Sequence, residues 1–194
     1  DFVTEPDGGQ WLVMERVAAG PIGPMSSPER VARAAVCVAG ALAALHDAGV
    51  VHGDVKPANV LAEDARAWLV DLGLAGDLHR VGAAPSGTLR YLAPECLAGE
   101  RGVAADLFAL GVTLVEALTG RHPFVDEPDD RDALLRYLVA PTPPRAEVLA
   151  AAPEAMRAAL AWLLEGDPAR RPWSARQWLA RWARDVGVAA QDVG

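Results

Sequence analysis

The stretch His52-Gly53-Asp54-Val55-Lys56-Pro57-Ala58-Asn59 places an acid, a cation and an amide in one short loop. Asp54 is a candidate proton acceptor, because a positioned carboxylate can take a proton from a reacting group. Lys56 supplies a point charge suited to a phosphate, and Asn59 offers an oxygen ligand for a hard cation such as Mg²⁺. Pro57 stiffens the turn by fixing its own φ angle. The loop predicts a reaction centre that the rest of the chain holds in place.

Two short apolar segments follow this loop and read as strands. They are Val60-Leu61-Ala62 and Ala67-Trp68-Leu69-Val70, separated by a largely polar turn. An antiparallel hairpin returns to where it began, so Asn59 before it and Asp71 after it should lie at the same end. Two oxygen ligands would then meet there. Mg²⁺ needs no more from the protein when the phosphates of a nucleotide supply most of its other ligands.

At this point the chain resembles the C-terminal lobe of a protein kinase. His52-Gly53-Asp54 with Asn59 matches the catalytic loop, and Asp71-Leu72-Gly73 matches the metal-binding Asp-Phe-Gly motif with Leu in place of Phe. Further motifs follow in the family's order, namely the end of an activation segment, the start of a buried helix and a late arginine motif. These are Gly87-Thr88-Leu89-Arg90-Tyr91-Leu92-Ala93-Pro94-Glu95, Asp106-Leu107-Phe108-Ala109-Leu110-Gly111 and Asp167-Pro168-Ala169-Arg170-Arg171-Pro172.

The resemblance implies a mainly α (α+β) fold, a helical lobe with a short catalytic-loop β-hairpin and a remnant strand of the small lobe. It implies one partial kinase domain over residues 1–194, in which 1–17 hold the last small-lobe strand and the hinge and 18–194 form the C-terminal lobe. Residues 10–15 are expected to form that strand after the turn Asp7-Gly8-Gly9. The resemblance also implies the contacts with adenine: Met14 as gatekeeper, backbone groups of Glu15 and Val17, and Leu61 as the floor.

The N-terminus begins at Asp1 without a methionine, which indicates a fragment or a processed product. The Gly-rich phosphate cover, the strand lysine that grips the phosphates and its helix glutamate are missing upstream, and Lys56 is the only lysine in the chain. We therefore expect the chain as given to be inactive or nearly so. We also expect the strand near 11–14 to lack sheet partners and to leave an exposed edge.

Helices should make up most of the chain after the hinge. Residues 18–25 are too rich in Gly and Pro for a helix. Ser26-Ser27-Pro28-Glu29 then reads either as a capping box or as a Ser N-cap with Pro at the first helical position. That helix should run to about Ala48 and end at Gly49. Further helices are expected near 107–118, 133–139, 153–165 and 174–186, with Trp162, Trp173, Trp178 and Trp182 spaced for helix packing.

The activation segment identifies the type of kinase that the chain resembles. By resemblance, Thr88 bridges Asp54 and Lys56 and indicates a Ser/Thr enzyme, although from the sequence alone it reads as an ordinary turn hydroxyl. Gly53 replaces the arginine with which many kinases hold an activation-loop phosphate, so the loop is of the non-RD type. Ser86 is the only hydroxyl before Thr88 in this segment. We expect activity that does not depend on phosphorylation there, so that Ser86→Ala leaves the rate nearly unchanged.

Three charged residues outside the loop have expected structural roles. Asp106 reads as a helix N-cap and, by resemblance, as an acceptor for backbone N–H groups of the catalytic loop. Glu95 and Arg171 should form a buried ion pair that anchors the substrate segment to the late helices.

Composition agrees with a folded lobe that works inside the cell. The chain has 194 residues and 52% hydrophobic residues, enough for a sizeable core. A net charge of -8 argues against nucleic acid or an anionic membrane as a partner. Cys37 and Cys96 have no metal-ligand spacing and read as reduced structural residues. No apolar run reaches the length of a membrane span and no signal peptide opens the chain, so we expect a cytoplasmic location and no membrane contact from this segment.

The resemblance implies a bacterial-type Ser/Thr protein kinase lobe that transfers the γ-phosphoryl group of ATP to a protein hydroxyl with the help of Mg²⁺. Asp54 would orient the hydroxyl and accept its proton, Lys56 would stabilise the transferring group, and Asn59 with Asp71 would hold the metal. One alternative is an aminoglycoside-type small-molecule phosphotransferase, which shares the catalytic layout. Another is a pseudokinase or scaffold, since the phosphate-covering lobe is missing. Lys56-Pro57 and Ala93-Pro94-Glu95 favour a protein substrate, and the intact set of catalytic residues argues against a scaffold.

Overall fold

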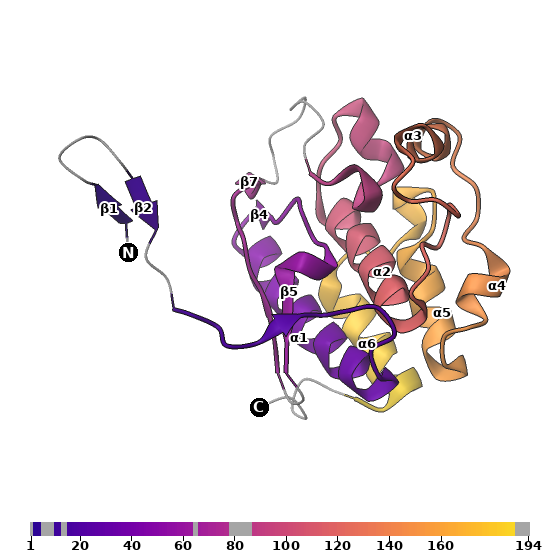
Figure 1. Cartoon of the computed structure of the whole chain (residues 1–194), viewed down its shortest axis with the longest axis horizontal. Helices are drawn as coiled ribbons and strands as arrows, with labels where there is room; N and C mark the ends of the chain where they lie inside the picture. The colour runs from indigo at the N-terminus through magenta and orange to yellow at the C-terminus, as the bar shows by residue number, and fades with distance from the viewer. Residues whose placement is uncertain (1, 5–9, 13–14, 64–65, 78–86, 189–194) are drawn as a thin grey trace.

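The computed structural model describes residues 2–4, 10–12, 15–63, 66–77 and 87–188, which fold mainly as α-helices (Figure 1). The α-helices are α1 (Pro28–Asp47), α2 (Val103–Thr119), α3 (Arg131–Val139), α4 (Ala146–Leu149), α5 (Glu154–Leu163) and α6 (Ala175–Val186). Short 3-10 helices are η1 (Pro57–Asn59), η2 (Leu89–Tyr91), η3 (Pro94–Ala98) and η4 (Pro168–Arg170). The strands are β1 (Phe2–Thr4), β2 (Gln10–Leu12), β3 (Gly20–Pro21), β4 (Val50–Val51), β5 (Val60–Ala62), β6 (Ala67–Leu69) and β7 (Gly76–Asp77). The mainly α class expected from the sequence is confirmed.

Helix α1 begins and ends as its sequence predicts. The hydroxyl oxygen of Ser27 accepts a hydrogen bond from the backbone N–H of Arg30 at 3.3 Å, and Pro28 occupies the first helical position. Of the two readings left open above, the Ser N-cap is therefore the one that forms. Gly49 follows the helix with a φ of +76°, which glycine adopts without steric cost. The buried side of α1 carries Val31, Ala35, Val38 and Leu42 into the core.

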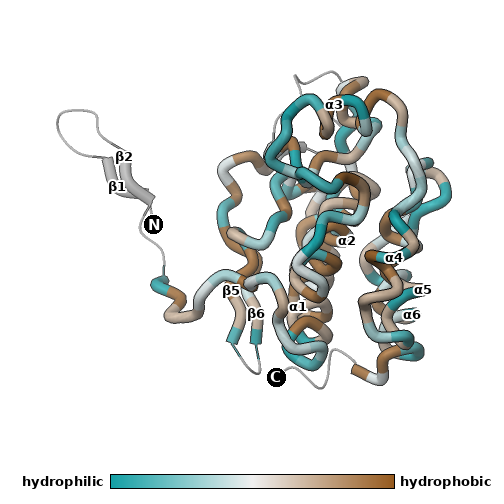
Figure 2. Tube along the Cα trace, turned by 45° about the vertical axis from the view of Figure 1, so that its right-hand side comes forward, coloured by the Kyte–Doolittle hydropathy of each residue, from teal (hydrophilic) through white to brown (hydrophobic). Residues whose placement is uncertain are grey.

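Helix α2 passes through the middle of the helical body and is buried along most of its length (Figures 1 and 2). Gly111 permits close packing against α5, because a Cβ atom at this position would lie 2.8 Å from the Cβ of Leu163. The expected start of the helix near residue 107 is wrong, because α2 begins at Val103 after Gly102. Its expected end is right, since Gly120 closes it with a φ of +67°.

Two tryptophans on α6 complete the core beside α1 and α5. Trp178 and Trp182 are fully buried, with ring centroids 4.8 Å apart, and the indole N–H of Trp178 donates to the carbonyl of Ala159 at 2.9 Å. Trp162 is partly buried against this core. Trp173 is 76% exposed, so the expectation that it packs between helices is wrong. Trp173 lies before Ser174, the N-cap of α6, and so outside the buried face of the helix.

The strands form small antiparallel sheets. The predicted hairpin is present as β5 and β6, with Leu61 opposite Trp68, and β3 adds a third strand beside β5. The two-residue strands β3, β4 and β7 had no alternation long enough to predict them. Strand β2 pairs with β1, so the expectation that it lacks a sheet partner is wrong. Phe2-Val3-Thr4 has the aromatic and β-branched residues of a strand, and it supplies that partner.

Candidate active site

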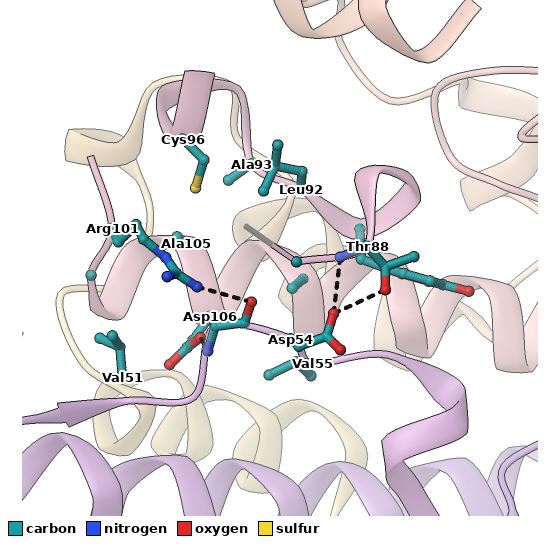
Figure 3. Close-up of a pocket in the computed structure, with 15 residues that line it drawn as sticks. Val51, Asp54, Val55, Thr88, Leu92, Ala93, Cys96, Arg101, Ala105 and Asp106 are labelled. Carbon is teal, nitrogen blue, oxygen red and sulfur yellow. Dashed lines mark hydrogen bonds between the residues drawn. The ribbon is translucent and has the colours of Figure 1, made fainter. Parts of the chain in front are cut away.

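The carboxylate of Asp54 is the centre of a buried polar cluster (Figure 3). Its Oδ2 accepts a hydrogen bond from Nζ of Lys56 at 2.6 Å. Its Oδ1 accepts from both the backbone N–H and the hydroxyl of Thr88, at 2.9 and 3.0 Å. Lys56 Nζ also donates to the Thr88 hydroxyl at 3.0 Å. The structure thus brings together three residues that are predicted as catalytic, two from the loop and one from the start of η2.

The electrostatics of this cluster keep Asp54 ionised. Burial by itself raises the pKa of the carboxyl group, because it penalises the charged form. Hydrogen bonds from Lys56 and Thr88 outweigh burial, so the pKa of Asp54 lies below its usual value of 3.8. At neutral pH the group is therefore a carboxylate that can accept a further hydrogen bond from a hydroxyl.

Asn59 and Asp71 lie at the same end of the β5–β6 hairpin, as the sequence predicted. The backbone N–H of Val70 donates to the carbonyl of Asn59 at 2.9 Å, which closes the hairpin at that end. The side-chain N–H of Asn59 donates to the carbonyl of Asp54 at 2.8 Å, which leaves its amide oxygen as the atom for a cation. Asp71 is exposed, and its Oδ1 accepts from the N–H of Gly73 at 3.1 Å. Among the described residues, no group of three or more His, Cys, Asp or Glu side chains could hold a metal alone.

The catalytic loop is fixed from behind by Asp106. Its carboxylate accepts backbone N–H groups of His52 and Gly53, both at 2.8 Å. The second of the two roles expected for Asp106 is therefore confirmed, while the N-cap role is wrong because the residue lies within the first turn of α2. His46 Nε2 lies 2.9 Å from the same carboxylate, a contact that was not predicted from the sequence. Its place in the last turn of α1 gave no signal of a contact 60 residues further on.

The remaining predicted residues are those expected to contact adenine. Leu61 on β5 is half-buried, Glu15 is exposed and Val17 is half-buried. Met14 lies outside the described residues, as do Ser86 and the turn predicted at 7–9.

No helix among the described residues is long and apolar enough to cross a membrane.

A comparison with known families identifies the same family that the sequence motifs indicate. The family model of the protein kinase domain matches residues 3–182. This chain belongs to the protein kinase family. Members of this family generally use ATP and Mg²⁺.

Bacterial Ser/Thr kinases are among the relatives of this kinase domain. The DNA damage-responsive serine/threonine-protein kinase RqkA of Deinococcus radiodurans is 35% identical over 200 residues, covering 94% of this chain and 30% of the relative. PknJ of Mycobacterium tuberculosis is 35% identical over 191 residues, covering 87% of this chain and 31% of the relative. PknH of the same species is 34% identical over 204 residues, covering 97% of this chain and 31% of the relative. The chain therefore spans slightly less than a third of the length of these curated relatives.

The predicted ion pair anchors the end of the kinase activation segment. Both Nη atoms of Arg171 donate to the carboxylate of Glu95, at 2.6 and 3.0 Å. Arg171 also donates to the carbonyls of Glu165 and Ala104 at 2.7 and 3.0 Å, and its guanidinium lies over the ring of Phe108 at 4.7 Å. The guanidinium is fully buried, and its donors reach acceptors on several elements, so the prediction of a buried structural pair is confirmed.

A second polar network beside the loop was not predicted. Glu116 is a second buried acid of α2, after Asp106, and it accepts from Arg90 Nε and the Tyr91 hydroxyl, both at 2.8 Å. His122 Nε2 lies 2.9 Å from the carbonyl of Arg90. One signal of this network was present in the sequence, which is a glutamate with apolar neighbours on both sides. A glutamate that is buried among apolar residues needs a cation or a hydrogen-bond donor as a partner. His122 is buried and packs against Phe124, with ring centroids 5.9 Å apart.

Proposed function

We propose that this chain is the catalytic lobe of a Ser/Thr protein kinase that transfers the γ-phosphoryl group of ATP to a Ser or Thr hydroxyl of a protein. The observation that supports it best is the Asp54 carboxylate held between Lys56 and Thr88, in a family member with bacterial Ser/Thr kinases as relatives. A lysine that contacts both the acid and the threonine favours a Ser/Thr kinase, as the sequence resemblance implied.

In the proposed reaction, Asp54 accepts a hydrogen bond from the hydroxyl of the protein substrate and orients its oxygen toward the γ-phosphorus. The new O–P bond forms as the bond to the β,γ-bridging oxygen breaks, and the hydroxyl proton passes to the Asp54 carboxylate. Lys56 lies beside that carboxylate and would neutralise charge on the transferring phosphoryl group. Thr88 would hold Asp54 and Lys56 in a fixed relative position. Most of the rate enhancement would come from positioning and electrostatics.

Asn59 and Asp71 fit the requirements of Mg²⁺, since both offer oxygen at one end of the hairpin and the Asn59 nitrogen is already used. When bound, the metal would neutralise charge on the phosphates. Leu61 would lie under adenine, with backbone groups of Glu15 and Val17 at its edge. Met14, proposed as gatekeeper, lies outside the described residues.

The division into hinge (1–17) and C-terminal lobe (18–194) belongs to this proposal. So do a cytoplasmic location and a protein substrate. The absence of a nucleic-acid partner belongs to it as well, and the net charge of -8 supports that part.

The test is Asp54→Asn in the protein as its cell makes it. The amide keeps the shape of the side chain but cannot take the proton, so we expect phosphorylation of a generic Ser/Thr protein substrate to be abolished while ATP binding stays largely intact. Incorporation of ³²P into the protein substrate measures phosphorylation, and binding of a fluorescent ATP analogue measures ATP binding. Asp47→Asn, at an exposed ion pair with Arg176, is the matched control and should behave as wild type. Phosphorylation by Asp54→Asn at the wild-type rate would refute the proposed role.

A further inference from the structure

The space beside Gly53 is filled by a side chain from another part of the chain. Gly53 has a φ of +78°, in the left-handed region that glycine adopts without steric cost. A Cβ atom at this position would lie 2.2 Å from Nη2 of Arg101 and 3.0 Å from the carbonyl oxygen of Leu74. Arg101 lies just before α2, 48 residues further along the chain. Its guanidinium therefore occupies the volume that a side chain at position 53 would take.

The same guanidinium contacts the peptide group that leads into Asp54. Arg101 Nη2 donates to the carbonyl of Gly53 at 3.3 Å (Figure 3). The N–H of this peptide group belongs to Asp54 and donates to Nδ1 of His52, also at 3.3 Å. Both polar atoms of the peptide group are thus held by side chains. The orientation of this peptide group helps to set the φ angle of Asp54, and with it the direction in which the Asp54 side chain leaves the backbone.

The charge of Arg101 is not used in an ion pair within the described part of the chain. The carboxylate of Asp106, which lines the same small cavity, is already occupied by the N–H groups of His52 and Gly53. That cavity has a volume of about 30 Å³, and its lining also includes the buried thiol of Cys96. It has room for about one water molecule beside the guanidinium. The position of Arg101 is therefore explained by the Gly53 carbonyl rather than by an acid.

We propose that Arg101 is a positioning residue for the reaction described above. Its guanidinium fills the place of the side chain that Gly53 lacks and fixes the Gly53–Asp54 peptide group, and through it the Asp54 carboxylate. Asp106 holds the loop by accepting hydrogen bonds from backbone N–H groups of the loop, and Arg101 holds it by donating to a backbone carbonyl oxygen of the loop. This inference rests on the proposed kinase activity, because it concerns the residue that would orient the substrate hydroxyl.

The first test compares Arg101→Met with Arg101→Lys in the protein as its cell makes it. Met keeps most of the apolar stem but has no donor, whereas Lys keeps a donor and a charge. We expect Met to lower kcat about tenfold, the size expected for one hydrogen bond from a charged group. The KM for ATP and the thermal unfolding midpoint should stay near wild type, and Lys should recover part of the lost kcat. Arg184→Met, at an exposed position on α6, should behave as wild type.

The second test is a double-mutant cycle with Gly53→Ala. The new methyl group collides with the guanidinium only when Arg101 is present, whereas the φ strain and the contact with Leu74 are common to both backgrounds. We expect Gly53→Ala to lower kcat by a larger factor in the wild type than in Arg101→Ala.

The outcomes separate the two proposals. A wild-type protein no more active than Asp54→Asn would refute the kinase function and this inference with it. An active wild type with wild-type kcat for Arg101→Met would refute the inference alone. It would also fail if Met and Lys lost kcat and thermal stability to the same extent, because that result would indicate packing without positioning. Equal factors in the cycle would refute it too, because they would show that the guanidinium does not act at position 53.

Discussion

At the scale of single residues, the hydroxyl of Thr88 is the contact that joins the two loop residues. It donates to Asp54 and accepts from Lys56, both at 3.0 Å. Thr88→Val keeps the shape and the backbone N–H bond but loses both hydroxyl contacts. Hydrogen bonds to charged groups contribute about 1.5–3 kcal/mol, so we expect kcat for a protein substrate to fall by roughly 10 to 100-fold. Thr88→Ser should keep most of the activity. Equal rates for the Val and Ser variants would contradict this role.

Residues within one motif could be placed from the sequence, whereas their distant partners could not. Asp54, Lys56 and Asn59 follow one another in a short loop, and the hairpin geometry brings Asp71 to them. Arg101 reaches this loop from the segment before α2, and His46 at the end of α1 contacts Asp106, which holds the loop. Their contacts depend on how helices pack, which no local pattern encodes.

At the scale of elements, the Glu95–Arg171 pair ties η3 to the segment before α6. Arg171→Met should lower the free energy of unfolding by about 3–5 kcal/mol, because it leaves a buried carboxylate without its cation. Urea unfolding at neutral pH measures this loss. The matched control is Arg176→Met, which removes an exposed pair with Asp47 and should change stability by about 1 kcal/mol or less. The prediction fails if the two variants lose similar amounts.

Element boundaries show which local signals the tertiary structure overrides. Ser27-Pro28 and Gly49 bound α1 as predicted, because caps act through the backbone nearby. Asp106 has a side chain suited to an N-cap, yet α2 begins at Val103 and Asp106 is used by the catalytic loop instead. The four-residue helix α4 was not predicted, since its turn of helix is too short for a hydrophobic period.

At the scale of the whole molecule, the family and the helical fold followed from motifs spread over most of the chain. The family model matches residues 3–182, which confirms that the resemblance extends over most of the sequence. The buried polar network around Glu116 could not be predicted, because its members come from η2, α2 and the segment after α2. Such a network forms only when the helices close around it, so it should couple the stability of the lobe to pH.

His122 provides the test of that coupling. Its Nδ1 accepts from the N–H groups of Phe124 and Val125, both at 3.2 Å, so protonation there would break two bonds. Burial lowers the pKa of His122 below its usual value of 6.5; the hydrogen bond to the Arg90 carbonyl and the Glu116 carboxylate oppose this shift, and the positive charges of Arg90 and Arg145 assist it. The unfolded chain then binds the proton first as the pH falls. The contribution of His122 to stability is complete above pH 6.5 and is lost as the pH falls from there toward the folded-state pKa.

We therefore expect the free energy of unfolding to fall as the pH is lowered from about 6.5, with a slope from this one group of at most about 1.4 kcal/mol per pH unit. Urea unfolding of the wild type and of His122→Asn at pH 7.5, 6.5 and 5.5 measures the effect, with pH values chosen about one unit either side of the usual histidine pKa. Asn can present an oxygen near the position of Nδ1 but does not titrate, so its curve should be shallower than that of the wild type. Carboxylates elsewhere in this acidic chain titrate alike in both proteins and cancel in the difference. Parallel curves would show that His122 does not carry this pH dependence.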